Sequence, residues 1–167
     1  MKYALITGAF GGMGSSVTEE LSRNGYFVFA LDRNVHDCGE NVLPIKCDVT
    51  DEESIIRAFT AVSEVTDKLD AVLHFAGIYM LDSFVEAETE RLDRIFDVNL
   101  RGAILINKTF MPLLHENSRI IMTTSELAPL DPLPFTGIYA VTKSALDKYA
   151  FSRYQYSTKT HRHSVIP

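Results

Sequence analysis

Two side chains in the C-terminal third of the chain have the types and spacing of an acid–base pair. Tyr139 and Lys143 are four residues apart, so that in a helix both lie on the same face. A free phenol has a pKa of about 10, which is too high for easy proton exchange near neutral pH. A neighbouring ammonium group favours the phenolate, and the phenol can then act as acid or base closer to cellular pH. The same two residues also fit a solvated helix face, so their interpretation depends on the rest of the chain.

A glycine cluster near the N-terminus has the form of a phosphate-binding turn. The apolar run at residues 2–7 predicts a buried strand, and residues 15–24 predict a helix. The segment between them contains Gly8, Gly11, Gly12 and Gly14. Glycines allow the backbone to approach a pyrophosphate closely, and the N-terminus of the helix adds N–H donors and a positive dipole. This strand–turn–helix unit predicts a dinucleotide-binding fold.

An acidic residue follows the next predicted strand at the expected distance. The apolar run at residues 26–31 ends at Asp32, about 20 residues beyond the glycine turn. At the end of that strand a carboxylate can accept hydrogen bonds from the hydroxyls of an adenosine ribose. The glycine cluster and Asp32 together favour nucleotide binding more strongly than either feature alone.

Taken together, these motifs resemble those of the classical short-chain dehydrogenase/reductase family. The resemblance is carried by Thr7-Gly8-x-x-x-Gly12-x-Gly14, Asp48-Val49, Phe75-Ala76-Gly77, Asn99, Ser125 and Tyr139-x-x-x-Lys143, in the order of the family. It implies that the catalytic residues are Asn99, Ser125, Tyr139 and Lys143. It also implies a cofactor held by Gly8, Phe10, Gly11, Gly12, Met13, Gly14, Asp32, Arg33, Asp48, Val49, Phe75, Ala76, Gly77, Tyr139 and Lys143.

The resemblance also implies a role for each catalytic residue. Tyr139 would exchange a proton with the substrate oxygen, and Lys143 would lower the pKa of that phenol and bind the nicotinamide ribose. Ser125 would hold the substrate oxygen as negative charge develops on it. Asn99 would hold a water that relays protons toward Lys143. From the residues alone, Asn99 could instead be a junction between two helices and Ser125 a simple strand-end hydroxyl, and either threonine preceding Ser125 could take its place.

The implied reaction is hydride transfer between an alcohol and a ketone with NAD or NADP. Asp32 would accept hydrogen bonds from a free 2′-hydroxyl and repel a 2′-phosphate, so NAD is expected. Gly11 stands where many NADP-using members of the family place a cation. Arg33 could reach a 2′-phosphate, so NADP stays the alternative. Two other functions remain open: a non-catalytic NAD-binding remnant, and an extended family member resembling nucleotide-sugar epimerases or dehydratases, whose glycine spacing also fits.

The alternation of predicted elements favours an α/β fold, a doubly wound Rossmann-type parallel sheet with helices on both faces. Further strands are predicted at 42–46, 71–75 and 119–124, and helices at 51–65, 88–96, 100–114 and 135–156. Residues 1–167 are predicted to form one NAD(P)-binding domain. After Tyr156 the helical pattern ends, and Ser164 begins what looks like the sixth strand of the family. Because its last strand and substrate lid are missing, we interpret the chain as an incomplete version of a longer protein, with a divergent remnant as the alternative.

One departure from the family pattern lies in the middle of the chain. His74 and Phe75 occupy the place of paired asparagines in the resembling family. His74 lies in an apolar run and has no partner at metal-ligand spacing. We therefore interpret His74 as a hydrogen-bonded core residue and not as a metal ligand or a base.

Composition excludes several other classes of protein. A net charge of −6 argues against a surface for nucleic acid or anionic membrane. No apolar stretch approaches the roughly 20 residues of a membrane helix, and the first strand begins at residue 2, so a cytoplasmic protein without a secretory signal is expected. Cys38 and Cys47 have neither metal-ligand spacing nor the pattern of a disulfide framework, so we expect no metal site.

Apolar residues suggest what the protein binds. Residues 78–81 and 127–135 follow two of the predicted strands and are mostly apolar, which indicates an alcohol or ketone substrate with an apolar body. The helices predicted at 100–114 and 139–156 are more apolar than one core-facing stripe requires. The excess residues are Ile104, Leu105, Phe110, Tyr149 and Phe151. In the resembling family these helices form a subunit interface, so we expect a homodimer or homotetramer.

Overall fold

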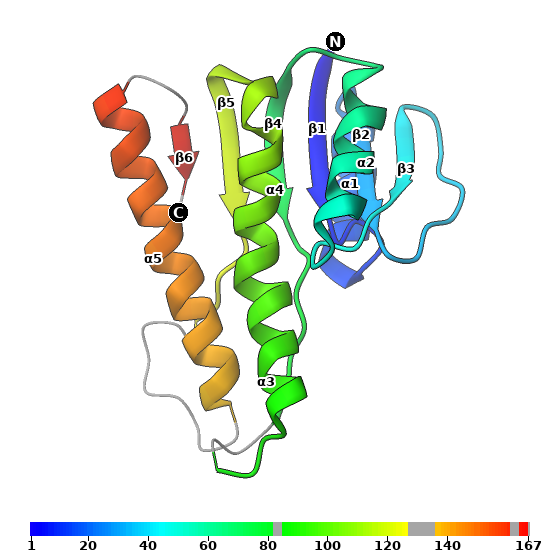
Figure 1. The fold of residues 1–167 in the computed structure, drawn as a ribbon. Helices are drawn as coiled ribbons and strands as arrows, with labels where there is room; N and C mark the ends of the chain where they lie inside the picture. Colours follow the sequence, from blue (N-terminus) through cyan, green and yellow to red (C-terminus); the bar gives the residue numbers. More distant parts are fainter. Residues whose placement is uncertain (82–84, 127–135, 161–163, 167) are drawn as a thin grey trace.

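The computed structural model describes residues 1–81, 85–126, 136–160 and 164–166, with residues 154–160 and 164–166 described by their backbone alone. In this part of the chain six parallel strands form one sheet in the order β3-β2-β1-β4-β5-β6 (Figure 1). The strands are β1 Lys2–Thr7, β2 Tyr26–Asp32, β3 Val42–Lys46, β4 Leu69–His74, β5 Leu114–Met122 and β6 Ser164–Ile166. The strand order reverses between β1 and β4, and ligands of such sheets bind beyond the carboxyl ends of the strands at that point.

Helices connect the strands and confirm the predicted doubly wound α/β fold. They are α1 Gly12–Arg23, α2 Glu52–Ser63, α3 Thr89–Phe96, α4 Gly102–Phe110 and α5 Gly137–Thr160. A π-helical turn, η1 (Asp97–Arg101), joins α3 to α4, and a 3-10 turn, η2 (Met111–Leu113), leads into β5. Figure 1 shows α3 and α4 running on as one long helix beside α5.

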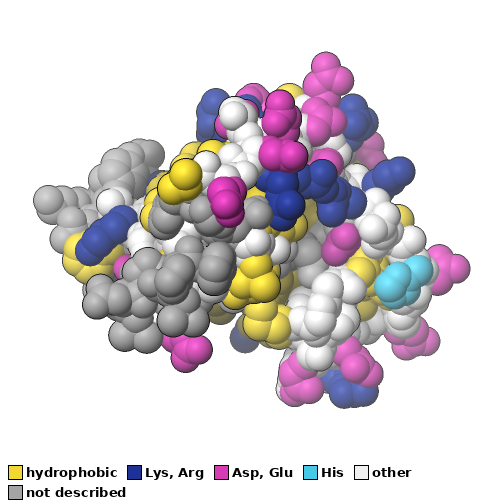
Figure 2. Space-filling model, turned by 90° about the horizontal axis from the view of Figure 1, so that it is seen from below, with side chains coloured by type: hydrophobic (Ala, Val, Ile, Leu, Met, Phe, Trp, Pro, Cys, Tyr) yellow, Lys and Arg dark blue, Asp and Glu magenta, His cyan; other side chains and the backbone are white. Residues whose placement is uncertain are grey.

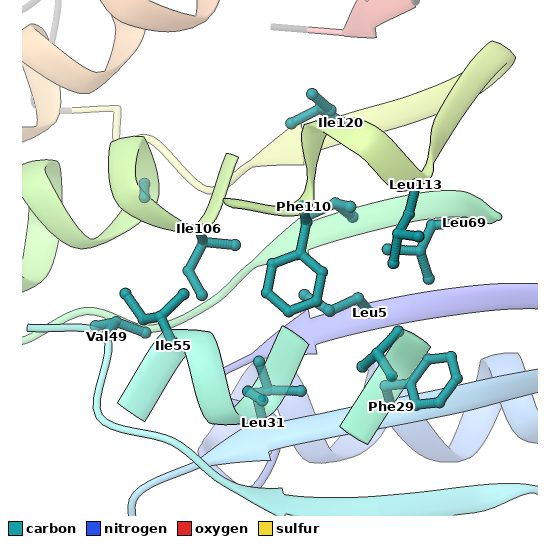
Figure 3. Packing of buried hydrophobic residues seen from close by; sticks show 14 of the residues in the cluster. Leu5, Phe29, Leu31, Val49, Ile55, Leu69, Ile106, Phe110, Leu113 and Ile120 are labelled. Carbon is teal, nitrogen blue, oxygen red and sulfur yellow. The ribbon is translucent and has the colours of Figure 1, made fainter. Parts of the chain in front are cut away.

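Alternation along the central strands sends successive side chains to two separate cores. The larger core, on the side of α2 and α4, includes Leu5, Phe29, Leu31, Ile55, Ile106 and Phe110 (Figure 3). The smaller core, on the side of α1, includes Ala4, Ile6, Val28 and Ala30, with Val17 and Leu21 from the helix. Helices therefore cover both faces of the sheet, and the two cores hold the carboxyl ends of β1, β2 and β4 in place.

Several predicted boundaries were wrong, and the helix predicted at 100–114 is divided among η1, α4, η2 and the first residue of β5. β5 begins at Leu114 and not at Arg119, because Leu114 pairs with Leu69 through a shift in strand register. α5 continues to Thr160 although the helical pattern ends at Tyr156, since an established helix gains one backbone hydrogen bond with each added residue. The sixth strand predicted from Ser164 is confirmed as β6.

Candidate active site

The glycine turn between β1 and α1 makes close contacts between backbone atoms. Gly8 has a φ of +68°, and a Cβ on it would lie 2.6 Å from the backbone nitrogen of Ala76. A Cβ on Gly14 would lie 2.0 Å from the Gly8 carbonyl oxygen. Above Gly12, by contrast, a Cβ would meet nothing within 4 Å. The turn thus offers an open backbone surface at the start of α1, which fits a pyrophosphate.

Asp32 lies at the end of β2 with its carboxylate held from both sides. Its Oδ2 accepts a hydrogen bond from the Phe10 N–H at 3.1 Å, and its Oδ1 accepts one from the Asn34 N–H at 3.2 Å. Because a carboxylate oxygen can accept more than one hydrogen bond, both oxygens keep capacity for ribose hydroxyls. The carboxylate is therefore oriented before any nucleotide binds.

A cavity of about 150 Å³ opens next to this turn. Its lining comprises Gly8, Gly11, Leu31, Asp32, Arg33, Cys47, Asp48, Val49, Phe75, Ala76, Gly77, Ile78 and Val98. The structure thus brings most of the predicted cofactor residues together. Sequence reasoning missed Leu31, Cys47, Ile78 and Val98. The position of Leu31 and Cys47 at strand ends was an available signal, whereas Ile78 lies four residues beyond β4 and Val98 lies in η1.

Some predicted cofactor residues lie outside the lining of this cavity. The ring of Phe10 packs against His36, with ring centroids 4.3 Å apart, and lines a different cavity beside α1. Gly12 and Met13 form the exposed first turn of α1, and Met13 is 60% exposed. Only their backbone is placed to meet a phosphate at the helix N-terminus.

Charged groups lie beside the part of this cavity that Arg33 and Asp48 line. A second cavity of about 390 Å³ is lined by Arg33, Asp48, Thr50, Glu90, Asp93, Arg94, Asp97 and Val98. Burial alone would raise the pKa of Asp48, but the hydrogen bonds from Thr50 and the charges of Arg33 and Arg94 lower it below its ordinary value. Figure 2, a view onto the carboxyl ends of the strands, shows basic and acidic side chains gathered beside hydrophobic ones.

Asn99 is a buried residue within the π-helical turn and is 1% exposed. Its Oδ1 accepts a hydrogen bond from the Ile78 N–H at 2.7 Å. Its Nδ2 donates to the Ile78 carbonyl at 2.9 Å and to the Thr142 hydroxyl at 3.1 Å. Asn99 thus fastens the segment after β4 to α5. Since both amide hydrogens are engaged, its side chain could contact a relay water only through Oδ1.

Lys143 is buried and reaches the end of the cleft from α5. Its Nζ donates a hydrogen bond to the Thr123 carbonyl at 2.8 Å, just beyond the end of β5. Burial lowers the pKa of Lys143 below its ordinary value. A Cβ on Gly77 would lie 3.6 Å from this Nζ and 3.4 Å from Asn99 Oδ1. Gly77, Asn99 and Lys143 therefore meet at the Gly77 end of the 150 Å³ cavity.

Tyr139 stands one helical turn before Lys143, in the first turn of α5. Its ring centroid lies 5.8 Å from Lys143 Nζ, and its ring packs edge-on against that of Tyr79 at 4.7 Å. Ser125 is half-buried in the segment after β5, two residues beyond Thr123, whose carbonyl binds Lys143. The four predicted catalytic residues thus come from elements that converge at one end of the cleft. The predicted substrate loop at 127–135 lies outside the described residues.

His74 is confirmed as a hydrogen-bonded core residue. It is 4% exposed, and its Nε2 lies 3.0 Å from Asn107 Oδ1. Burial, with a smaller contribution from the charge of Lys143, lowers the pKa of His74 to about 4 in spite of the hydrogen bond to Asn107. The imidazole is therefore neutral at neutral pH.

Other features of the described residues limit the chemistry. They contain no group of histidine, cysteine and acidic residues that could hold a metal ion. Cys38 and Cys47 are both free, and burial raises the pKa of Cys47 to about 11, so that this thiol stays protonated. Within the same residues, no helix has the length and apolar character to cross a bilayer.

Comparison with known proteins gives consistent matches. A family model described as "short chain dehydrogenase" matches residues 2–159. The NADPH-dependent 1-acyldihydroxyacetone phosphate reductase of Saccharomyces cerevisiae is 31% identical over 89% of this chain and 54% of its own length. A short-chain dehydrogenase/reductase from Serratia marcescens superposes with a TM-score of 0.83 at 26% identity, over 92% of this chain and 71% of the other.

A third match shows the same fold at lower identity. It is a 3-ketoacyl-(acyl-carrier-protein) reductase from Brucella melitensis, solved in complex with NADH, which superposes with a TM-score of 0.86 at 24% identity. The match covers 96% of this chain and 72% of the other. Measured against four curated relatives, the chain spans between 54% and 60% of their length.

Proposed function

Because the chain belongs to the short-chain dehydrogenase family of oxidoreductases, we propose that it interconverts an alcohol and a ketone with a nicotinamide cofactor. The observation that carries the proposal is the meeting of Gly77, Asn99 and Lys143 at the end of the nucleotide cavity. Tyr139, the proposed proton donor, lies one helical turn away from Lys143. A cavity for a nucleotide therefore leads to a group that can exchange a proton.

The cofactor proposed for this cleft is NAD. The carboxylate of Asp32 is oriented by Phe10 and Asn34, and a free ribose hydroxyl can donate to it whereas a 2′-phosphate would be repelled. Arg33 lies beside Asp48, which offsets its charge locally. NADP is the alternative, and relatives include one named as NADPH-dependent and one solved with NADH.

Within this proposal, each side chain has a defined task. The bound nicotinamide supplies or accepts the hydride. Tyr139 gives its phenolic proton to the substrate oxygen in reduction and takes it back in oxidation. Ser125 donates a hydrogen bond to the same oxygen and stabilises the negative charge that develops there. Lys143, oriented by the Thr123 carbonyl, places positive charge near the phenol and binds the nicotinamide ribose.

Asn99 has a positioning task in this proposal. It holds both backbone groups of Ile78 and the hydroxyl of Thr142, and so fixes the floor of the cleft against α5. A relay water toward Lys143 would be held by the Oδ1 atom, which faces the same space as the Lys143 ammonium.

Aromatic surface beside Tyr139 supports an alcohol or ketone with an apolar body. The Tyr79 ring is 55% exposed and packs edge-on against Tyr139. Leu81, two residues beyond Tyr79, is 63% exposed. An apolar substrate would cover these side chains and exclude water from the proton-transfer site.

We further propose a cytoplasmic homodimer or homotetramer that uses the outer faces of α4 and α5. Phe151 is 48% exposed and Val141 is 44% exposed on α5. Of the residues expected at an interface, Phe110 is fully buried in the core and cannot contact a second subunit, whereas Tyr149 is half-buried and bonded to Asn107. The exposed apolar residues of α5 support the interface.

The proposal is tested by removing the phenolic oxygen in the full-length natural protein. Tyr139→Phe should lower the reduction of straight-chain and cyclic apolar ketones by about 10²–10⁴-fold, the usual contribution of general acid–base catalysis. Its NADH affinity should stay within about twofold of the wild type, since the phenol does not hold the pyrophosphate. Lys143→Met should lower both turnover and NADH affinity. Tyr26→Phe, at the opposite end of the sheet, is the matched control and should change neither.

The outcomes separate the candidate functions. Near-wild-type turnover by Tyr139→Phe would overturn the assignment of the proton donor. NADH binding without turnover of any ketone, in the wild type as well, would favour the non-catalytic NAD-binding alternative. If the protein were given a nucleotide sugar and released one with an inverted stereocentre or with water removed from the sugar, the epimerase-like or dehydratase-like alternative would be favoured.

A further inference from the structure

His74 connects the centre of the sheet to two helices through its side chain. Its Nε2 lies 3.0 Å from Asn107 Oδ1 on α4, and Asn107 Nδ2 donates to the Tyr149 hydroxyl on α5 at 3.4 Å. An amide oxygen can only accept a hydrogen bond, so Nε2 must carry the ring hydrogen. Since burial also lowers the pKa of His74 to about 4, the ring is the neutral Nε2–H tautomer, with Nδ1 deprotonated.

The backbone of His74 leads to the same helix by a second path. Its carbonyl accepts a hydrogen bond from the Thr123 N–H at 3.2 Å. The Thr123 carbonyl in turn accepts the hydrogen bond from Lys143 Nζ at 2.8 Å. Starting from His74, one path thus ends at Tyr149 and the other at Lys143, six residues apart on α5.

We propose that His74 is a positioning residue for Lys143. Its ring fixes α5 through Asn107 and Tyr149 so that the Lys143 ammonium reaches the Thr123 carbonyl and the end of the cleft. The inference rests on the proposed function, in which Lys143 binds the nicotinamide ribose. It assigns a task to a residue that stands where the resembling family has an asparagine.

The charges around His74 agree with this arrangement. Lys143 is the charged group that acts on the ring from α5, and Tyr149 is a neutral phenol whose pKa is raised chiefly by burial. Asn107 contributes an uncharged amide from α4. A protonated imidazole would place a second buried cation near Lys143, and the neutral tautomer avoids that repulsion.

A purely structural histidine would stabilise the fold without a specific effect on Lys143. A double-mutant cycle on NADH affinity separates the two possibilities. In the full-length protein, His74→Phe keeps a ring but removes the donor, and it should weaken NADH binding by about threefold to tenfold, as expected for a lost buried hydrogen bond. If His74 acts through Lys143, adding His74→Phe to Lys143→Met should weaken NADH binding no further.

Two further variants complete the experiment. Tyr149→Phe removes only the phenol at the far end of the path, is mild enough to fold, and should weaken NADH binding in the same direction by a smaller factor. Ser118→Ala is the control, because Ser118 is buried in the middle of β5, away from Thr123, and donates to the Leu69 carbonyl at 2.6 Å. It should lower the free energy of unfolding and leave NADH affinity unchanged.

The results distinguish failure of the inference from failure of the proposed function. If Lys143→Met itself leaves NADH affinity unchanged, the proposed role of Lys143 is wrong, and His74 with it. If Lys143→Met weakens binding but the effects of His74→Phe and Lys143→Met add, His74 does not position Lys143. Wild-type NADH affinity in both His74→Phe and Tyr149→Phe would overturn the inference in the same way.

Discussion

The cleft has two parts that are shaped differently. Backbone geometry determines the shape of the proposed nucleotide half, formed by residues 2–32. In the proposed catalytic half, formed by His74, Asn99, Tyr139 and Lys143, side chains from distant segments determine the shape. Gly14 lies against the Gly8 carbonyl within the turn, and Gly8 lies against the backbone of Ala76, so main-chain contacts define this part of the cleft. Asn99, by contrast, bonds Ile78 and Thr142 across 21 and 43 residues of chain. Close backbone contacts thus shape the proposed phosphate site, while side-chain hydrogen bonds between distant segments orient the groups proposed to handle a proton.

The same contrast explains what the sequence could predict. The glycine turn, β2 and Asp32 follow one another within a short stretch, and each has a strong local signal, so this half was predicted nearly as the structure shows it. Gly12 and Gly14 belong to the first turn of α1, which therefore begins earlier than the helix predicted from residue 15.

The catalytic half could not be predicted to the same depth. The motif places Tyr139 and Lys143 on one helix. The position of the Lys143 ammonium, however, depends on its hydrogen bond to the carbonyl of Thr123, which lies 20 residues earlier in the chain. The π-helical turn around Asn99 has no signal of its own in the residues, because it accompanies the pairing of Asn99 with Ile78. His74 was expected in the core, yet its partner Asn107 lies 33 residues further on.

The dependence of the free energy of unfolding on pH would sharpen the comparison between the two halves of the cleft. The catalytic half contains the buried imidazole of His74, and the described residues of the nucleotide half contain no buried histidine. The pKa of His74 is about 4 in the folded protein and 6.5 ordinarily, so the unfolded chain binds the proton more tightly. The stabilising effect is complete above about pH 6.5 and is lost as the pH falls toward 4, amounting to about 3 kcal/mol. Urea unfolding measured between pH 7.5 and pH 4.5 should show this loss.

The control for that measurement is His74→Phe, which cannot take up a proton. Its free energy of unfolding should be lower at pH 7.5 but should fall less steeply over the same range. Equal slopes in the two proteins would mean that His74 is not the residue that binds the proton on unfolding.

Cofactor preference tests the nucleotide half on its own. If the oriented carboxylate of Asp32 selects NAD, calorimetry should show NADH binding at least about tenfold more tightly than NADPH, a difference of about 1.4 kcal/mol. Asp32→Asn keeps the shape of the side chain and removes its negative charge, so the preference for NADH over NADPH should become smaller. Asp37→Asn removes a nearby exposed charge and should preserve the preference. Equal affinities for NADH and NADPH in the wild type would indicate that attraction to Arg33 cancels the repulsion between Asp32 and a 2′-phosphate.

The most direct test of the proposed cleft is whether a dinucleotide lies on the glycine turn. In the structure a Cβ has open space at both Gly12 and Gly39, so neither Gly12→Ala nor Gly39→Ala should disturb the fold. When NADH binds, the pyrophosphate should occupy the space above Gly12 and not that above Gly39. Calorimetric titration should therefore show NADH affinity reduced at least about tenfold in Gly12→Ala and unchanged in Gly39→Ala. Wild-type NADH affinity in Gly12→Ala would contradict the assignment of the cleft.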